Sequence, residues 1–195
     1  TGRYRLAPRL VELGAIALAG LDVRGLARPH LRALVEETGE TATLSVPGAP
    51  DAITVDFVQS DASVQSVARV GRPSVAHATA AGKVVLALGG VALPPGPLRR
   101  FTPATITDRA VLRAEVARVR ELGHARALGE RESDLNAIAV PVVDSAGELA
   151  AVLGVQGPAA RFAGEALDRA IASAAGHARL VSRALGASTG DSASG

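Results

Sequence analysis

With 195 residues, of which 48% are hydrophobic, the chain is long enough for one domain with a flanking helix or tail and can bury a substantial core. Cysteine is absent, which excludes disulfides, thiol catalysis and cysteine-ligated zinc. The formal net charge is only +2 and no run of five Lys or Arg occurs, so the concentrated basic surface of a nucleic-acid-binding domain is missing.

Two helices and a group of strands are expected in the first part of the chain. Apolar residues at helical spacing predict helices over Leu6–Gly20 and Val23–Thr38, and Gly39 is well placed to end the second. Three antiparallel strands with short connections are expected next: Thr41–Val46, Ala52–Gln59 and Ser63–Val70.

The middle of the chain is expected to form two further helices. The segment Gly71–Lys83 is rich in small residues and leads into a helix that ends near Leu88. After a loop that contains three prolines, Thr107 or Asp108 is expected to cap a helix that Gly123 ends.

The last part of the chain is expected to add three strands and a long helix. Pro141 removes one backbone donor, so its strand should lie at a sheet edge or carry a bulge there. A final helix is expected over Ala163–Leu185. The three strands are His124–Leu128, Asn136–Val143 and Leu149–Gln156. Because strands come in groups and do not alternate with helices, the order predicts an α+β fold with one antiparallel sheet of about six strands flanked by helices.

Signatures of catalysis and of metal binding are missing from the sequence. No GxSxG elbow, Walker A motif or GxGxxG motif occurs, and none of the four histidines has the HxxxH or HExxH spacing. We therefore expect no catalytic residue, no metal and no cofactor. His77, in the small-residue segment, is more typical of a core or capping histidine than of a ligand or switch.

Two short segments have both a chemical and a structural interpretation. The acidic cluster Glu130, Glu132 and Asp134 has the residue types of a general acid and base, but such clusters are more often ion-pair networks or solvated loops. The run Ala80–Lys83 places backbone N–H groups at a helix start, which suits an anion. Close packing of a helix on a sheet also requires small residues there, and the sequence favours neither interpretation.

Three segments of the chain carry a set of short motifs in a fixed order. They are Tyr4–Gly14, Gly71–Leu88 and Gly129–Phe162. The motifs are a Gly-Lys pair before a helix, a Glu ahead of a hairpin, a hairpin motif and a closing Gly-Pro, at Gly82-Lys83, Glu130, Ala139-Pro141-Val142-Asp144-Gly147 and Gly157-Pro158. Taken together, the three segments resemble the effector-binding part of IclR-family transcription regulators.

The resemblance implies a GAF-like domain over residues 21–185 that senses a small organic effector. It implies the end of a wing and a linker helix at 1–20, and we expect a disordered tail at 186–195. Family members form homodimers or homotetramers and bind operator DNA through an N-terminal winged helix-turn-helix domain that is not part of this chain. No 18-residue apolar run or signal peptide occurs, so we expect a cytoplasmic protein with no membrane partner.

The resemblance also implies a ligand-binding pocket, in which three positions depart from the family pattern. Its residues would be Ser66, Ser74, Ala80, Ala81, Ala127, Ala137, Gly154 and Gln156. Ala127 stands where members that bind small acids carry an acidic residue, and Gly154 and Gln156 stand where they carry serines. Such changes enlarge and dry a pocket. The expected effector is therefore an aromatic or alicyclic carboxylate, with its anionic end held by backbone N–H groups near Ala80–Gly82.

Two other functions remain open at this point. One is a small hydrolase-like enzyme that uses Glu130 or Asp134 with His77. The other is a purely oligomerising domain that binds no ligand.

Overall fold

The computed structural model describes residues 22–62, 69–71 and 73–187. The expected helix Leu6–Gly20, residues 63–68 of the expected strand Ser63–Val70, and the tail beyond residue 187 lie outside the described residues. Arg69 and Val70, at the end of that expected strand, are described and belong to no strand.

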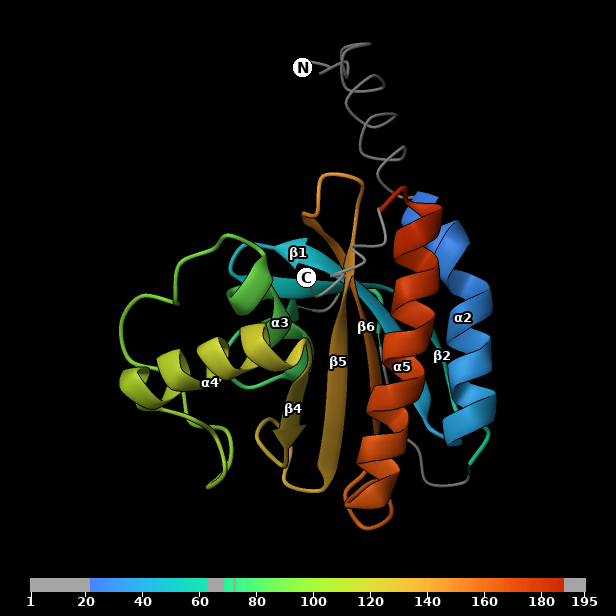
Figure 1. The fold of residues 1–195 in the computed structure, drawn as a ribbon. Coiled ribbons are helices and arrows are strands. Elements are labelled where there is room, and N and C mark those ends of the chain that lie inside the picture. The colour runs from blue at the N-terminus through green and yellow to red at the C-terminus, as the bar shows by residue number, and fades with distance from the viewer. Residues whose placement is uncertain (1–21, 63–68, 72, 188–195) are drawn as a thin grey trace, which may run out of the picture.

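One antiparallel sheet forms the centre of the domain (Figure 1). The strand order is β3-β2-β1-β6-β5-β4, and each pair of neighbours is antiparallel. The expected α+β fold with about six antiparallel strands is confirmed. The strands are β1 (Thr41–Gly48), β2 (Asp51–Val58), β3 (Pro73–Ser74), β4 (Ala125–Leu128), β5 (Leu135–Val143) and β6 (Leu149–Pro158).

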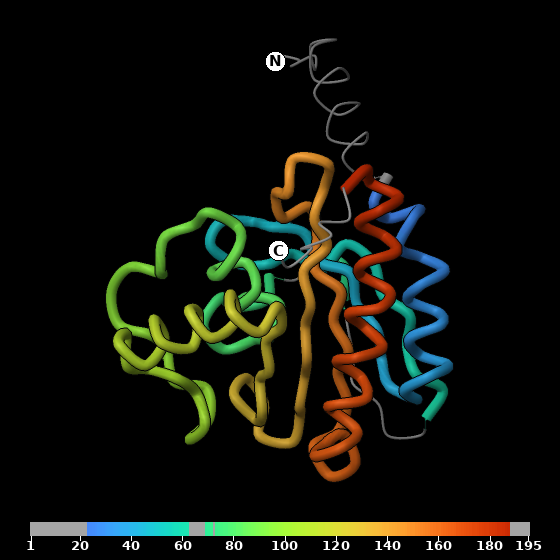
Figure 2. The backbone as a smooth tube through the Cα atoms, in the orientation of Figure 1, coloured from blue at the N-terminus to red at the C-terminus, as the bar shows by residue number. Residues whose placement is uncertain are grey.

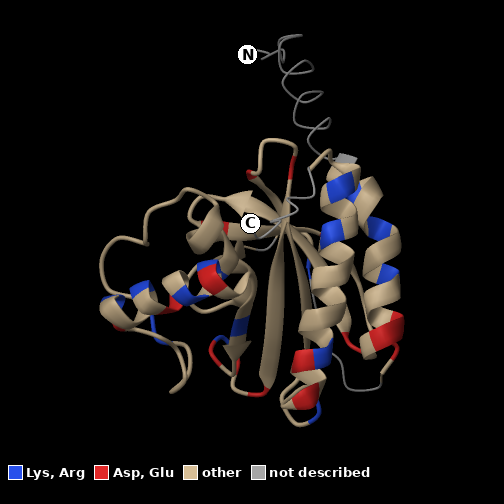
Figure 3. Cartoon of the chain, in the orientation of Figure 1, with Lys and Arg blue, Asp and Glu red and all other residues tan. Residues whose placement is uncertain are grey.

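Helices cover both faces of this sheet. The long helices α2 (Asp22–Thr38) and α5 (Glu165–Ala184) lie side by side on one face, and α3 (Ala80–Leu88) and α4 (Arg109–Leu122) lie on the other (Figure 1). Side chains alternate between the two faces of a strand, so each strand contributes to two cores. Neither β5 nor β6 contains a charged residue (Figure 3), as expected for strands covered on both faces.

The two cores differ in the size of their side chains. Leu31, Leu44 and Leu153 belong to the core under α2 and α5. The core under α3 and α4 contains many small residues, among them Ala127 and Ala139. Small side chains on the α3 face leave space between helix and sheet.

The helix ends follow the local sequence. Asp108 begins α4, because its side chain accepts the amide hydrogens of Ala110 and Val111. Gly123 ends α4 in the left-handed conformation, with a φ of 69°. Of the two expected caps, Asp108 is therefore the one used. The loop between α3 and α4 leads to the N-terminal end of α4, which is the end that lies away from the sheet (Figure 2).

Pro141 lies where β5 has one neighbour. The pairing of β4 with β5 reaches only to Ala139, so Pro141 pairs with β6 alone, opposite Val152. A shift in register follows between Val142 and Val143. The expected edge position is confirmed locally, because β5 has only one neighbour at Pro141, while the irregularity lies one residue further on and not at Pro141 itself. None of the helices in the described part of the chain is long and apolar enough to cross a membrane.

Candidate functional site

A cavity of about 110 Å³ lies between the sheet and the N-terminal end of α3. Seven of the eight residues expected in the ligand pocket line it: Ser74, Ala80, Ala81, Ala127, Ala137, Gly154 and Gln156. The eighth, Ser66, lies outside the described residues. The fold therefore brings together residues that are up to 82 positions apart, from Ser74 to Gln156.

Strand register explains why these residues meet. Ala127 pairs with Ala137 across β4 and β5, and Ala137 pairs with Gln156 across β5 and β6. Gly154, two positions before Gln156, lies on the same face of β6. Because the side chains of Ala127 and Ala137 are short and Gly154 has none, space for the cavity remains between the sheet and α3.

Three hydroxyl-bearing residues on the sheet side of the pocket were missed by the sequence analysis. Thr43 and Ser45 from β1 and Thr54 from β2 line the cavity and are buried. Ser45 Oγ lies 3.5 Å from Thr54 Oγ1. The alternation of polar Thr43 and Ser45 with apolar Ala42 and Leu44 is the signal that points to this face once the fold is known. The pocket floor is therefore more polar than the sequence alone suggested.

The start of α3 offers fewer free donors than expected. Thr79 caps the helix, and its Oγ1 accepts the amide hydrogen of Gly82 at 3.1 Å. The expectation that Gly82 helps to hold an anion is therefore wrong, and the amides of Ala80 and Ala81 remain as donors at the helix start. A Cβ on Gly82 would lie 2.6 Å from Cα of Ala76, so close packing requires glycine here.

Lys83 is the centre of a buried ion-pair network. Its Nζ lies 2.6 Å from Oε1 of Glu130 and 3.3 Å from Oε1 of Glu115, and it donates to the carbonyl of Arg126 at 2.9 Å. Burial raises the pKa of the Glu130 carboxyl, and the charge of Lys83 opposes this rise. Glu115 is the member that the sequence analysis missed, because nothing near it in the sequence indicates its partner.

Two threonine hydroxyls, together with the Lys83–Glu130 ion pair, fix the position of the loop that follows β4. Thr105 Oγ1 donates to the carbonyl of Glu130 at 2.7 Å, and Thr102 Oγ1 donates to the carbonyl of Gly129 at 2.6 Å. The next two residues, Arg131 and Glu132, line the cavity. The guanidinium of Arg131 lies 4.1 Å from the ring centre of Phe101. The acidic cluster thus includes one structural carboxylate, Glu130, and one pocket residue, Glu132.

The residues of the hydrolase-like alternative do not assemble into an acid–base pair. His77 is buried, and its Nε2 lies 2.9 Å from the carbonyl oxygen of Arg99. Oε1 of Glu130 is held by Lys83, and among the described residues no hydrogen bond or ion pair joins His77 to either Glu130 or Asp134. The described residues also contain no group of three or more His, Cys, Asp or Glu placed to hold a metal ion.

Comparisons with known proteins agree with this architecture. The family model described as bacterial transcriptional regulator IclR C-terminal matches residues 15–183. The HTH-type transcriptional regulator XynR of Escherichia coli K12 is 34% identical over 146 residues, which are 72% of this chain and 58% of XynR. The chain thus spans less than two thirds of that relative.

Solved structures give the same result. The IclR crystal structure of Thermotoga maritima superimposes with a TM-score of 0.78 at 29% identity, covering 94% of this chain and 76% of that one. An IclR homologue of Microbacterium hydrocarbonoxydans, crystallised in complex with 4-hydroxybenzoate, gives a TM-score of 0.77 at 28% identity, with coverages of 94% and 76%.

The antiparallel sheet, its helical covers and the pocket under α3 define a GAF-like α+β domain. The chain belongs to the IclR family of bacterial transcriptional regulators, and the matched region is the C-terminal domain of that family.

Proposed function

We propose that this chain is the effector-sensing and oligomerising domain of a DNA-binding transcription regulator, and that it is not an enzyme. The observation that carries the proposal is the convergence of seven sequence-predicted residues on one cavity. Operator DNA would be bound by a winged helix-turn-helix domain outside this chain. A ligand that binds one arrangement of a homodimer or homotetramer more tightly would then change operator affinity.

We further propose that the effector is a carboxylic acid larger than two or three carbons, of the aromatic or alicyclic class. Ala127 and Ala137 offer an apolar surface for a ring, and Arg131 together with the amides of Ala80 and Ala81 offers groups for a carboxylate. The ring-acid complex of the Microbacterium homologue supports this ligand class. Ala127 supports a ring as well, since its small apolar side chain leaves space and apolar surface where a charged side chain would take up both.

Calorimetric titration of the chain tests the proposal. The acids are benzoate, 4-hydroxybenzoate, cyclohexanecarboxylate, glyoxylate and pyruvate, and each mixture is then checked for chemical change by NMR. Saturable binding of a ring acid without turnover supports the sensor. Tight binding of glyoxylate or pyruvate, with no binding of the larger acids, would show that the effector is not a ring carboxylic acid. Turnover that Glu130→Gln abolishes would establish the enzyme, and no binding of any acid would favour a purely oligomerising domain.

A further inference from the structure

A hydroxyl from β1 fills the space in front of Gly154. Thr43 and Gly154 are cross-strand partners in the pairing of β1 with β6, and both line the cavity. A Cβ on residue 154 would lie 2.7 Å from Thr43 Oγ1, closer than real Cβ contacts come. A side chain at 154 and the present position of the Thr43 hydroxyl therefore exclude each other.

Compared with the family pattern, the hydroxyl in this part of the pocket comes from β1 and not from β6. The resemblance to small-acid-binding family members places a serine hydroxyl at position 154, which this chain lacks. Thr43 Oγ1 stands beside the vacated space and restores a hydroxyl to this part of the pocket floor. Because it projects from a different strand, it approaches a ligand from a different direction.

The Thr43 hydroxyl has unused hydrogen-bonding capacity. No described residue forms a hydrogen bond with its side chain, whereas the neighbouring hydroxyls of Ser45 and Thr54 lie within 3.5 Å of each other. Only 9% of Thr43 is exposed, and the residue lines the cavity, so a molecule in the cavity can reach its hydroxyl. A ligand group that exchanges a hydrogen bond with this hydroxyl, in a site that excludes bulk water, gains net free energy.

We propose that Thr43 is a specificity-determining residue that forms a hydrogen bond with a hydroxyl group of the effector. Position 154 is glycine because any larger residue would displace the Thr43 hydroxyl. The inference rests on the proposed function and narrows its ligand class to ring carboxylic acids that carry a hydroxyl. The carboxylate binds on the side of α3 and Arg131, and the ligand hydroxyl exchanges a hydrogen bond with Thr43 Oγ1 on the sheet. A site built around such a bond rejects the analogue that lacks the hydroxyl.

Paired ligands and an isosteric variant test the inference. Dissociation constants are measured for benzoate, 3-hydroxybenzoate and 4-hydroxybenzoate with the wild-type chain and with Thr43→Val. We expect one hydroxybenzoate to bind the wild type about tenfold or more tightly than benzoate, as one good hydrogen bond allows. Thr43→Val removes the hydroxyl at nearly constant volume, so this preference should fall to about twofold or less while benzoate binding is retained.

Two further variants separate Thr43 from its surroundings. Ser45→Ala removes the neighbouring pocket hydroxyl and shows which of the two residues carries the preference, because retention of the preference assigns it to Thr43. Thr43→Ala combined with Gly154→Ser moves the hydroxyl back to β6 and should recover a preference that Thr43→Ala alone loses. Thermal unfolding of each variant, and the retained affinity for benzoate, show that a lost preference is not a loss of folding.

The outcomes distinguish this inference from the proposed function. If the wild type binds none of the acids, both are wrong. If the wild type binds them all equally, or if Thr43→Val keeps the hydroxybenzoate preference, the sensor stands and the role of Thr43 is wrong. Loss of the preference in Ser45→Ala, with no loss in Thr43→Val, would assign the role to Ser45.

Discussion

Lys83 and Glu130 form an ion pair that joins the two sides of the pocket. Nζ of Lys83 lies 2.6 Å from Oε1 of Glu130, and only 1% of the lysine side chain is exposed. Lys83 follows Ala81 on α3 by two positions, and Glu130 precedes Arg131 in the loop after β4. Since Ala81 and Arg131 both line the cavity, the pair holds the helix and the loop at a fixed separation.

Removal of the lysine should destabilise the domain strongly. Lys83→Met leaves the carboxylate of Glu130 without its cation, while Glu115 keeps Arg118, and an uncompensated buried charge costs about 3–5 kcal/mol. Glu130→Gln should cost less, because Lys83 keeps Glu115 and the carbonyl of Arg126. Urea unfolding followed by circular dichroism measures both.

The double variant Lys83→Met with Glu130→Met is the control. Two apolar side chains of suitable volume replace a buried pair at little cost, so the double variant should be more stable than Lys83→Met alone. An unfolding free energy for Lys83→Met equal to that of the wild type would show that the pair does not hold this part of the fold.

Two glycines in helices should respond to alanine in opposite ways. Gly82→Ala puts a Cβ 2.6 Å from the Cα of Ala76 and 2.7 Å from the carbonyl oxygen of Val75, and these backbone atoms cannot move without shifting α3. We expect a loss of about 1–3 kcal/mol in unfolding free energy. The matched variant is Gly176→Ala in α5, where the nearest atom is 4.0 Å away, and it should stabilise by about 0.5–1 kcal/mol. Equal effects of the two substitutions would contradict the packing argument.

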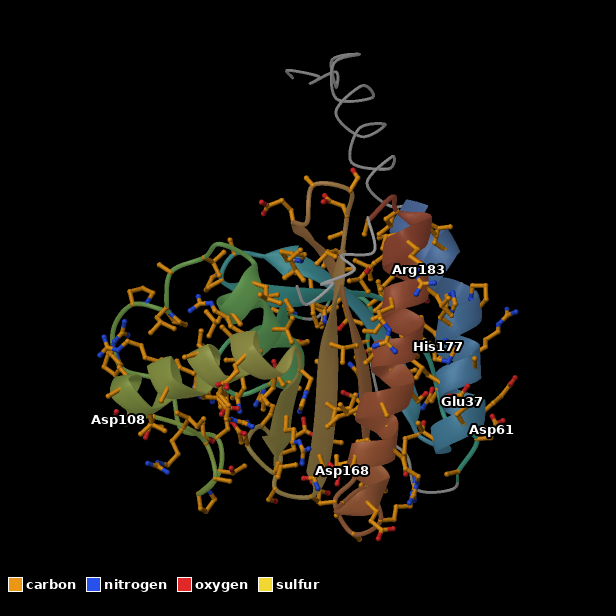
Figure 4. The ribbon with its side chains drawn as sticks, viewed as in Figure 1. Glu37, Asp61, Asp108, Asp168, His177 and Arg183 are labelled. Atoms are coloured by element: carbon orange, nitrogen blue, oxygen red, sulfur yellow. The ribbon has the colours of Figure 1, made fainter. Side chains whose placement is uncertain are left out.

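A histidine pair between α2 and α5 should make stability depend on pH. His30 Nδ1 and His177 Nδ1 lie 2.8 Å apart, a contact in which only one of the two nitrogens carries a hydrogen. His177 Nε2 also lies 3.2 Å from Oε1 of Glu37, and Figure 4 labels His177 on α5 and Glu37 on α2. Burial, and then the charge of His177, lower the pKa of His30 from its ordinary value of 6.5.

The lowered pKa of His30 determines how the stability of the domain changes with pH. As the pH falls below about 6.5, His30 takes up a proton in the unfolded chain before it does so in the folded one, so the domain loses stability. Urea unfolding between pH 5 and pH 7.5 should show this loss, and His30→Gln should make the profile flatter. A His30→Gln profile parallel to that of the wild type would exclude His30 as a source of the pH dependence.

An acidic residue in the pocket should weaken ring-acid binding. Ala127 is 5% exposed and lines the cavity, so Ala127→Asp places a charged group where the ring is proposed to lie and reduces both the space and the apolar surface. We expect at least tenfold weaker binding by calorimetry, since a carboxylate that a ring covers and does not pair costs more than about 1.4 kcal/mol. Leu128→Asp is the control, because Leu128 is the next residue of β4 and is 44% exposed. Equal affinities in Ala127→Asp and the wild type would place the ligand elsewhere.

Much of this protein was accessible from local sequence patterns. Apolar spacing predicted the helix that is α2, Asp108 and Gly123 predicted the ends of α4, and Pro141 predicted an incomplete sheet edge. The spacing of the Gly-Lys pair, the hairpin motif and the closing Gly-Pro indicated the family. All of these depend on a residue and its near neighbours, or on a pattern that stays recognisable along the chain.

Long-range pairing was decided only by the tertiary structure. Lys83 is 47 positions from Glu130 and 32 from Glu115. Nothing in the sequence around either carboxylate indicates that Lys83 is its partner. Thr43 was not expected in the pocket, because its role depends on the register that sets it opposite Gly154. A shift of one residue would turn Thr43 to the other face of the sheet. The sequence therefore predicted which small residues line the cavity, while strand register and the packing of α3 decided which polar groups face it.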